Sequence, residues 1–181
     1  MLFLIILLHL QNKLIERRMK KIIDHLAPIQ LVGITARTNN TAEMNPATGK
    51  IGPTLQRYFQ NNLAAKIKAS KKPGTTYCIY TDYESDCNGD YTYFVGEAVT
   101  ALNEVDPDLE TKLIPAQRYV KFTTDPGPMP AVCIELWQKI WTMTDADLSG
   151  TRAYIADFEV YDERSYDPHN AVLDIYIGIL N

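Results

Sequence analysis

The sequence predicts an α+β domain in which an antiparallel sheet carries its helices on one face. Runs rich in β-branched and aromatic residues alternate with two segments of helical periodicity. The order strand, helix, strand, strand occurs twice, in halves that span about residues 28–100 and 115–181. This repetition predicts a duplication with pseudo-twofold symmetry, in which the two halves join their sheets edge to edge.

The first half begins with a strand from Pro28, "PIQLVGITART", which ends in a polar loop. A helix is expected over residues 51–70, because Pro53 suits a first helical turn and Leu55, Tyr58/Phe59, Leu63 and Ile67 share one stripe. Two strands follow, "TTYCIYTDY" and "DYTYFVGEAV", and the Asn88-Gly89 pair between them favours a hairpin turn.

The second half repeats this order. The strand "AQRYVKFTTDPG" precedes the helix "PAVCIELWQKIWTM", and the strands "TRAYIADFEVYD" and "NAVLDIYIGIL" follow it. One face of the helix is predicted to be buried, because apolar residues recur at helical spacing at Cys133, Leu136, Trp137, Ile140 and Trp141.

Composition fits a single domain. The chain has 181 residues, 46% of them hydrophobic, and a formal net charge of -4, which argues against direct binding of nucleic acid. Its three cysteines follow no metal-ligand or disulfide spacing, so we expect reduced thiols and a cytoplasmic location. The histidines form no ligand cluster, and "ESDCNGD" lacks the final glutamate of a calcium loop, so no metal or cofactor is expected.

Residues 1–18 differ from the rest of the chain. The apolar run "MLFLIILLHL" is about half the length of a membrane-spanning helix, and a basic segment follows it. One interpretation is a weak membrane anchor; the other is a start codon assigned too early, with Met19 as the true beginning. Neither implies stable insertion in a membrane, and the domain itself is expected to span residues 19–181.

Glu159 is the residue that the strand pattern explains least. It stands in an apolar run, where a carboxylate needs a partner. Alternation separates it and Tyr161 from Phe158 and Val160, which we expect on the helix-covered face. By alternation alone, Glu159 faces either water or a wet cleft.

Three segments carry a resemblance to a known family. "IPAQRYVKFTTDPGP", "ELWQKIW" and "YIADFEVYDERSYDPHNAVLDIYIGIL" resemble the GyrI-like effector-binding domains, which are ligand-sensing modules of AraC- and MerR-type bacterial transcription regulators and also occur as free-standing proteins. The resemblance covers about residues 19–180. One departure is Gln56, which follows Leu55 where members often have tryptophan.

The resemblance implies a pocket that binds amphipathic, cationic small molecules, with Glu159 as its acid and the ligand as the partner of that acid. Tyr161 and Tyr176 are the expected neighbours on the last two strands, and Tyr93 and Trp137 are further candidates for the aromatic wall. Asp174 is a weaker second acid. With no segment before Pro28 long enough for a helix-turn-helix, a free-standing, non-enzymatic sensor is expected.

Two other hypotheses stay open. Glu159 would serve a hydrolase as general base on a reactive small molecule, although the sequence shows no second catalytic group. Alternatively, an acidic surface would bind a basic protein partner, as in a gyrase-inhibitor-like module.

Overall fold

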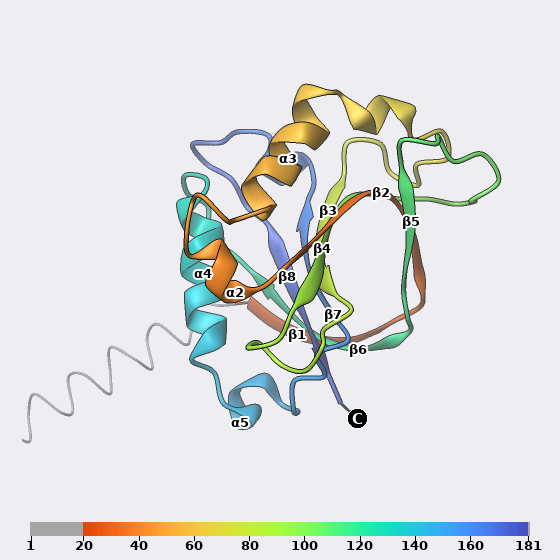
Figure 1. The fold of residues 1–181 in the computed structure, drawn as a ribbon. Helices are drawn as coiled ribbons and strands as arrows, with labels where there is room; N and C mark the ends of the chain where they lie inside the picture. The colour runs from red at the N-terminus through yellow and green to blue at the C-terminus, as the bar shows by residue number, and fades with distance from the viewer. Residues whose placement is uncertain (1–19, 181) are drawn as a thin grey trace, which may run out of the picture.

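The structure, a computed structural model, describes residues 20–180. The helices are α2 (Asn40–Glu43), α3 (Ile51–Gln60), α4 (Ala131–Trp141) and α5 (Asp145–Leu148), with short 3₁₀ helices η1 (Leu63–Lys66) and η2 (Glu163–Ser165). The strands are β1 (Lys20–Leu26), β2 (Ile29–Thr38), β3 (Thr76–Thr81), β4 (Tyr91–Ala98), β5 (Glu110–Ile114), β6 (Gln117–Thr123), β7 (Ala156–Tyr161) and β8 (Asp174–Ile179). These elements confirm the α+β class and the predicted order of strands and helices (Figure 1).

Two predicted elements begin or end differently from the sequence pattern. The first long helix ends at Gln60, and η1 continues it after Asn62, whose φ of 48° is left-handed. The strand predicted from residue 151 begins only at Ala156, since Tyr154 also has a left-handed φ, of 50°. A left-handed residue interrupts both a helix and an extended strand.

The strand order places the two halves side by side. All eight strands form one sheet in the order β1-β6-β8-β7-β3-β4-β2-β5, and every neighbouring pair is antiparallel. The second-half strands β6, β8 and β7 mirror the first-half strands β2, β4 and β3, and the halves meet where β7 pairs with β3. This mirrored order is what two joined halves would give; their origin by duplication stays a prediction.

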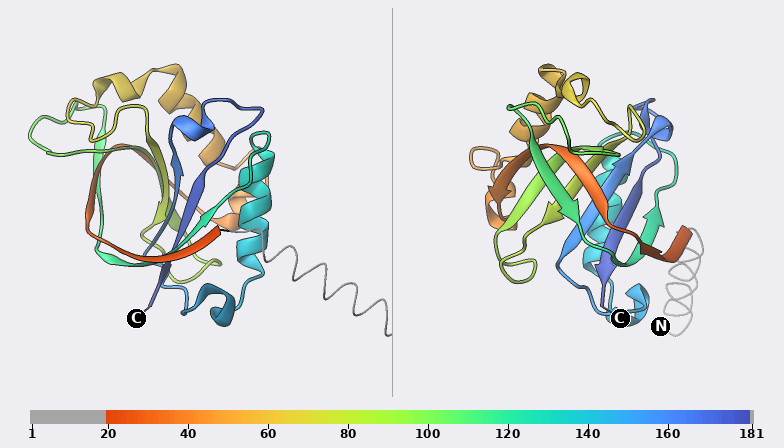
Figure 2. Two further views of the ribbon diagram at one scale, coloured as in Figure 1. Left: turned by 180° about the vertical axis from the view of Figure 1, so that it is seen from behind. Right: turned by 90° about the vertical axis from the view of Figure 1, so that its right-hand side faces the viewer.

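Strands β1 and β5, which the sequence pattern did not predict, close the sheet upon itself. Chain segment 20–33 runs antiparallel to segment 110–123, with β1 on β6 and β2 on β5. The two outer ends of the sheet are therefore the two ends of one bent ribbon. Figures 1 and 2 show β1, β2, β5 and β6 curving round to form a ring with the central strands.

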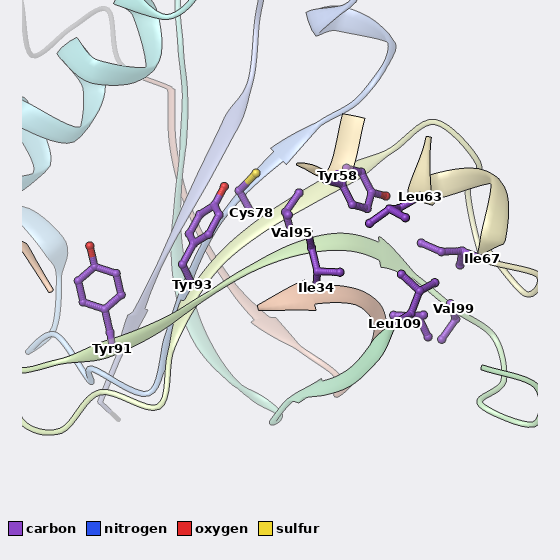
Figure 3. Close-up of a cluster of buried hydrophobic side chains, with 11 residues drawn as sticks. Ile34, Tyr58, Leu63, Ile67, Cys78, Tyr91, Tyr93, Val95, Val99 and Leu109 are labelled. Carbon is purple, nitrogen blue, oxygen red and sulfur yellow. The ribbon is translucent and has the colours of Figure 1, made fainter. Parts of the chain in front are cut away.

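Side chains inside this ring form one hydrophobic cluster. They come from six of the strands, namely Leu31, Ile79, Phe94, Ala98, Ile114, Tyr119, Ala156 and Phe158. We call this side of the sheet the inner face. The opposite side, here the helix face, carries α3 over β2 and β4 and α4 over β6 and β8, each with its own apolar cluster (Figure 3 shows the cluster under α3).

The buried stripes of the two long helices differ slightly from those predicted. Tyr58 in α3 and Trp137 in α4 are buried as expected, whereas Phe59 and Trp141 are each 60% exposed. Among residues 20–180, no helix is long and apolar enough to cross a bilayer. The predicted extension, residues 1–18, lies outside the described residues.

Two facing glycines make room for an aromatic ring on the inner face. Gly33 in β2 pairs with Gly96 in β4, and the Phe94 ring lies against both. A Cβ at Gly33 would overlap the Val95 carbonyl oxygen and lie 2.7 Å from both the Gly96 Cα and the Phe94 Cζ. Either the ladder or the buried ring would have to move.

We therefore expect Gly33→Ala to lower the free energy of unfolding by about 2–4 kcal/mol, as overpacking against backbone does. Guanidinium unfolding followed by circular dichroism measures this change. Gly52→Ala in α3 is the matched control, because its Cβ meets nothing within 4 Å. The control should be neutral or stabilising by up to about 1 kcal/mol; equal losses in both variants would refute the packing argument.

Candidate functional site

The candidate site lies on the helix face, at the seam where β3 of the first half pairs with β7 of the second. The register sets Cys78 opposite Glu159 and Tyr80 opposite Asp157. The neighbours of Glu159 along its own strand, Phe158 and Val160, point to the inner face. Glu159 therefore projects between the two long helices, beneath α4.

Glu159 is almost completely buried, with 4% of its surface exposed. Its Oε1 accepts a hydrogen bond from the Trp137 indole at 2.6 Å and one from the Tyr80 hydroxyl at 2.9 Å. Its Oε2 accepts from the Tyr161 hydroxyl at 2.7 Å. Three aromatic side chains of the protein itself are therefore partners of this carboxylate, and a ligand as a further partner stays a prediction.

A second acid on the same strand shows the contrast. Asp157 is fully buried, and its Oδ2 accepts from the Arg152 guanidinium at 2.6 Å, while its Oδ1 accepts from the Gly178 amide at 2.8 Å. Glu159 has no salt bridge to a described lysine, arginine or histidine. The Arg152 guanidinium compensates the charge of Asp157, whereas, among the described residues, Glu159 accepts hydrogen bonds from neutral side chains only.

The groups around Glu159 stay protonated. Burial, and secondarily the negative charge of Glu159, raises the pKa of the Tyr80 and Tyr161 hydroxyls well above the usual value. The same two causes raise the pKa of the Cys133 thiol. The tyrosines are therefore hydrogen-bond donors at neutral pH, and the thiol is not a thiolate nucleophile.

Two cavities open at opposite ends of the seam. One, of about 190 Å³, is lined by Tyr80, Tyr91 and Trp137. The other, of about 510 Å³, is lined by Cys78, Tyr161 and side chains of α3. Tyr80, Trp137 and Tyr161 thus contact Glu159 on one side and border a cavity on the other.

Four of the five predicted site residues gather here. Trp137 and Tyr161 bind Glu159 directly, and the Tyr93 ring lies edge-on to that of Tyr80, 5.5 Å away. Tyr176 does not belong to the group. It lies on the inner face, stacked on Phe158 at 4.5 Å, because its register partner is Phe158 and not Glu159.

The assignment of the two strand faces was also wrong. Phe158 and Val160 were expected under the helices, but the helices cover Glu159 and Tyr161 instead. Alternation identifies which residues share a face and leaves open which face the helices cover. The apolar set fills the inside of the ring, which the sequence pattern did not predict.

The prediction missed Tyr80. Tyr80 becomes a neighbour of Glu159 only through the pairing of β3 with β7, which joins the two halves of the chain. Of the other candidates, Asp174 is paired with Arg164 at 2.8 Å and accepts from Thr123 at 2.6 Å. Gln56, at the position where tryptophan is common, is exposed.

Comparison with known proteins assigns the chain to a family. The model of the family described as "Cass2: Integron-associated effector binding protein" matches residues 23–179. YobU of Bacillus subtilis (strain 168), named as a candidate transcriptional regulator, is 29% identical over 157 residues, which are 87% of this chain and 96% of that protein.

Two solved structures have a similar fold. The integron cassette protein from the mobile metagenome of Vibrio cholerae is 28% identical, with a TM-score of 0.71 over 90% of this chain and 99% of that one. The protein SAV2435, solved bound to tetraphenylphosphonium, is 16% identical, with a TM-score of 0.73 over 90% of this chain and 94% of that one. At that identity the second likeness concerns the fold alone.

Removing one donor tests the hydrogen bonding of Glu159. Trp137→Phe leaves the carboxylate short of its indole partner, so we expect the free energy of unfolding to fall by about 2–3 kcal/mol, as for a lost hydrogen bond to a buried charge. Trp141→Phe makes the same chemical change one helical turn later at an exposed ring. It should change stability by less than about 0.5 kcal/mol; equal losses would contradict the assignment.

The raised tyrosine pKa values predict a loss of stability in alkali. A hydroxyl whose pKa is higher in the folded than in the unfolded chain stabilises the fold below the unfolded pKa, about 10, and loses that contribution as pH rises further. The free energy of unfolding should therefore fall above about pH 10. Urea unfolding at a series of pH values measures it, and Tyr80→Phe should flatten the decline. A pH-independent free energy would contradict the prediction.

Proposed function

The chain belongs to the family of integron-associated effector-binding proteins, which is linked to transcription regulation, and from this premise we propose that it binds lipophilic cations over Glu159. The observation that carries the proposal is a buried carboxylate whose described partners are all neutral. A positive charge brought close to it gains attraction in a medium of low dielectric constant.

The shape of the site suits a cation with an apolar surface. The rings of Tyr80 and Trp137 meet edge to face beside the carboxylate, with centroids 5.2 Å apart, and a cation over either ring would make a cation–π contact there. Such contacts contribute about 0.5–2 kcal/mol each, depending on desolvation. Tyr80 and Trp137 also line the smaller cavity, so a ligand there would contact their rings directly.

The hydrogen bonding of Glu159 favours cations that need no acceptor. The carboxylate already accepts three of the roughly four hydrogen bonds that its two oxygens can take, so a ligand would be attracted mainly by its charge. Quaternary and phosphonium ions meet this condition, and the likeness of fold to a protein solved with tetraphenylphosphonium supports the choice of probe.

The same arrangement argues against a general base. A base must take a proton from water, but Oε1 and Oε2 are both held by donors with a raised pKa that keep their protons. The geometry therefore favours binding over the alternative of hydrolysis at Glu159.

Titration calorimetry with tetraphenylphosphonium tests the proposal. We expect binding to the wild-type protein, and a Kd raised at least about tenfold in Glu159→Gln, because the amide keeps the shape but loses the charge. Glu163→Gln makes the same change at an exposed acid just after β7 and should leave the Kd unchanged. Equal affinity of Glu159→Gln and wild type would refute the role of Glu159, and so would equal binding of a neutral compound of the same size.

A further inference from the structure

The larger cavity contains a second buried acid, Glu97 in β4. Glu97 is 3% exposed and lines the cavity of about 510 Å³. Its Oε2 accepts from the Ser70 hydroxyl, and its Oε1 accepts from the Gly74 amide at 3.3 Å. As for Glu159, no described basic side chain forms a salt bridge with it.

This acid is separate from the first. Glu159 is opposite Cys78, Cys78 is opposite Val95, and Glu97 lies two residues beyond Val95. Two strand spacings and two residues of rise put the Cα atoms of the two glutamates roughly 12 Å apart. The two carboxylates also accept hydrogen bonds from different donors, so each has its own surroundings.

Tyr58, which also lines this cavity, carries a buried hydroxyl without a partner in the part of the chain that the structure describes. Tyr58 of α3 is 1% exposed, and its hydroxyl has no hydrogen-bond partner among the described residues. A buried polar atom without a partner is uncommon and costly, so it indicates a group that the protein alone does not supply. Figure 3 shows the Tyr58 ring beside Leu63, with its hydroxyl on the side toward Leu63. Burial first, and the Glu97 charge second, raises the pKa of Tyr58, so the hydroxyl stays neutral and keeps lone pairs to offer.

Apolar side chains form part of the remaining lining, namely Leu55, Phe59, Ala64 and Met129, and the hydroxyl-bearing side chains Thr76, Tyr161, Ser165 and Tyr166 form another part. We propose that this cavity binds a primary ammonium group carried on a short apolar chain, with the carboxylate of Glu97 and the hydroxyl of Tyr58 as its acceptors. A primary ammonium has three N–H donors and no acceptor, which complements an acid and an unfilled hydroxyl. A quaternary ammonium has no N–H and would leave Tyr58 unpartnered, so this site selects the opposite kind of cation from the one expected at Glu159.

Calorimetric titration with n-hexylammonium chloride tests the inference, with hexyltrimethylammonium and hexan-1-ol as matched probes. The wild-type protein should bind hexylammonium roughly tenfold or more tightly than either of the others, as expected for charge-assisted hydrogen bonds in a buried site. Glu97→Gln should weaken hexylammonium by about tenfold. Tyr58→Phe, which removes only the unpartnered oxygen, should weaken it about threefold or more and leave hexyltrimethylammonium, which has no N–H, unchanged.

Tyr77→Phe is the matched control, since Tyr77 packs against the inner-face cluster on the other side of the sheet. It should bind all three probes as the wild type does. If Glu97→Gln fails to fold, Tyr58→Phe decides the outcome alone. Equal binding of hexylammonium and hexyltrimethylammonium would overturn the proposal. So would hexylammonium binding that Glu159→Gln abolishes and Tyr58→Phe leaves intact. A failure of tetraphenylphosphonium to bind would refute the proposal for Glu159 and leave this one standing.

Discussion

The burial of the Glu159 carboxylate at the seam constrains the rest of the site. A charged group removed from water must receive hydrogen bonds, and here Tyr80, Trp137 and Tyr161 donate them. Tyr80 comes from the first half of the chain and the other two from the second. The carboxylate is therefore satisfied only when β3 and β7 pair and α4 packs over them, so the site and the junction of the two halves form together.

The closed ribbon makes this arrangement possible. Since the inside of the ring is filled by Phe158, Tyr176 and their neighbours, the sheet has an apolar core that does not depend on the helices. The helix face is then free to carry polar groups along the seam. The helices α3 and α4 cover the two flanks, each over its own cluster, and the strip between them holds the acid and the cavities.

The sequence pattern was sufficient for the long helices and for the main strands of both halves, because period-2 and helical spacings are local. It left the side of Glu159 open, and the family resemblance singled that residue out. The pattern was not sufficient for β1 and β5. Ile22 and Ile23 in β1 are both exposed, and most of β5 is exposed as well, so neither strand shows the alternation of a half-buried strand. Their pairing joins residues far apart in the chain, from Gly33 with Glu110 to Lys20 with Thr123, which no local pattern encodes. The same lack of long-range information placed Tyr176 beside Glu159, when the register of β7 and β8 sets it on the opposite face.

Three buried acids differ in how completely the protein itself supplies their partners. Asp157 has an arginine, a tyrosine and a backbone amide, so its charge and its hydrogen-bonding capacity are both met within the fold. Glu159 has donors but no opposite charge, and Glu97 has fewer donors and an unpartnered hydroxyl nearby. An acid paired with a cation of the protein attracts a charged ligand weakly, because the two charges cancel. An acid that accepts hydrogen bonds only from neutral donors can be buried and still keeps an uncompensated negative charge. Under the two proposals, the acceptor capacity that each carboxylate has left selects the cation: at Glu159 one attracted mainly by charge, and at Glu97 one that also brings N–H donors.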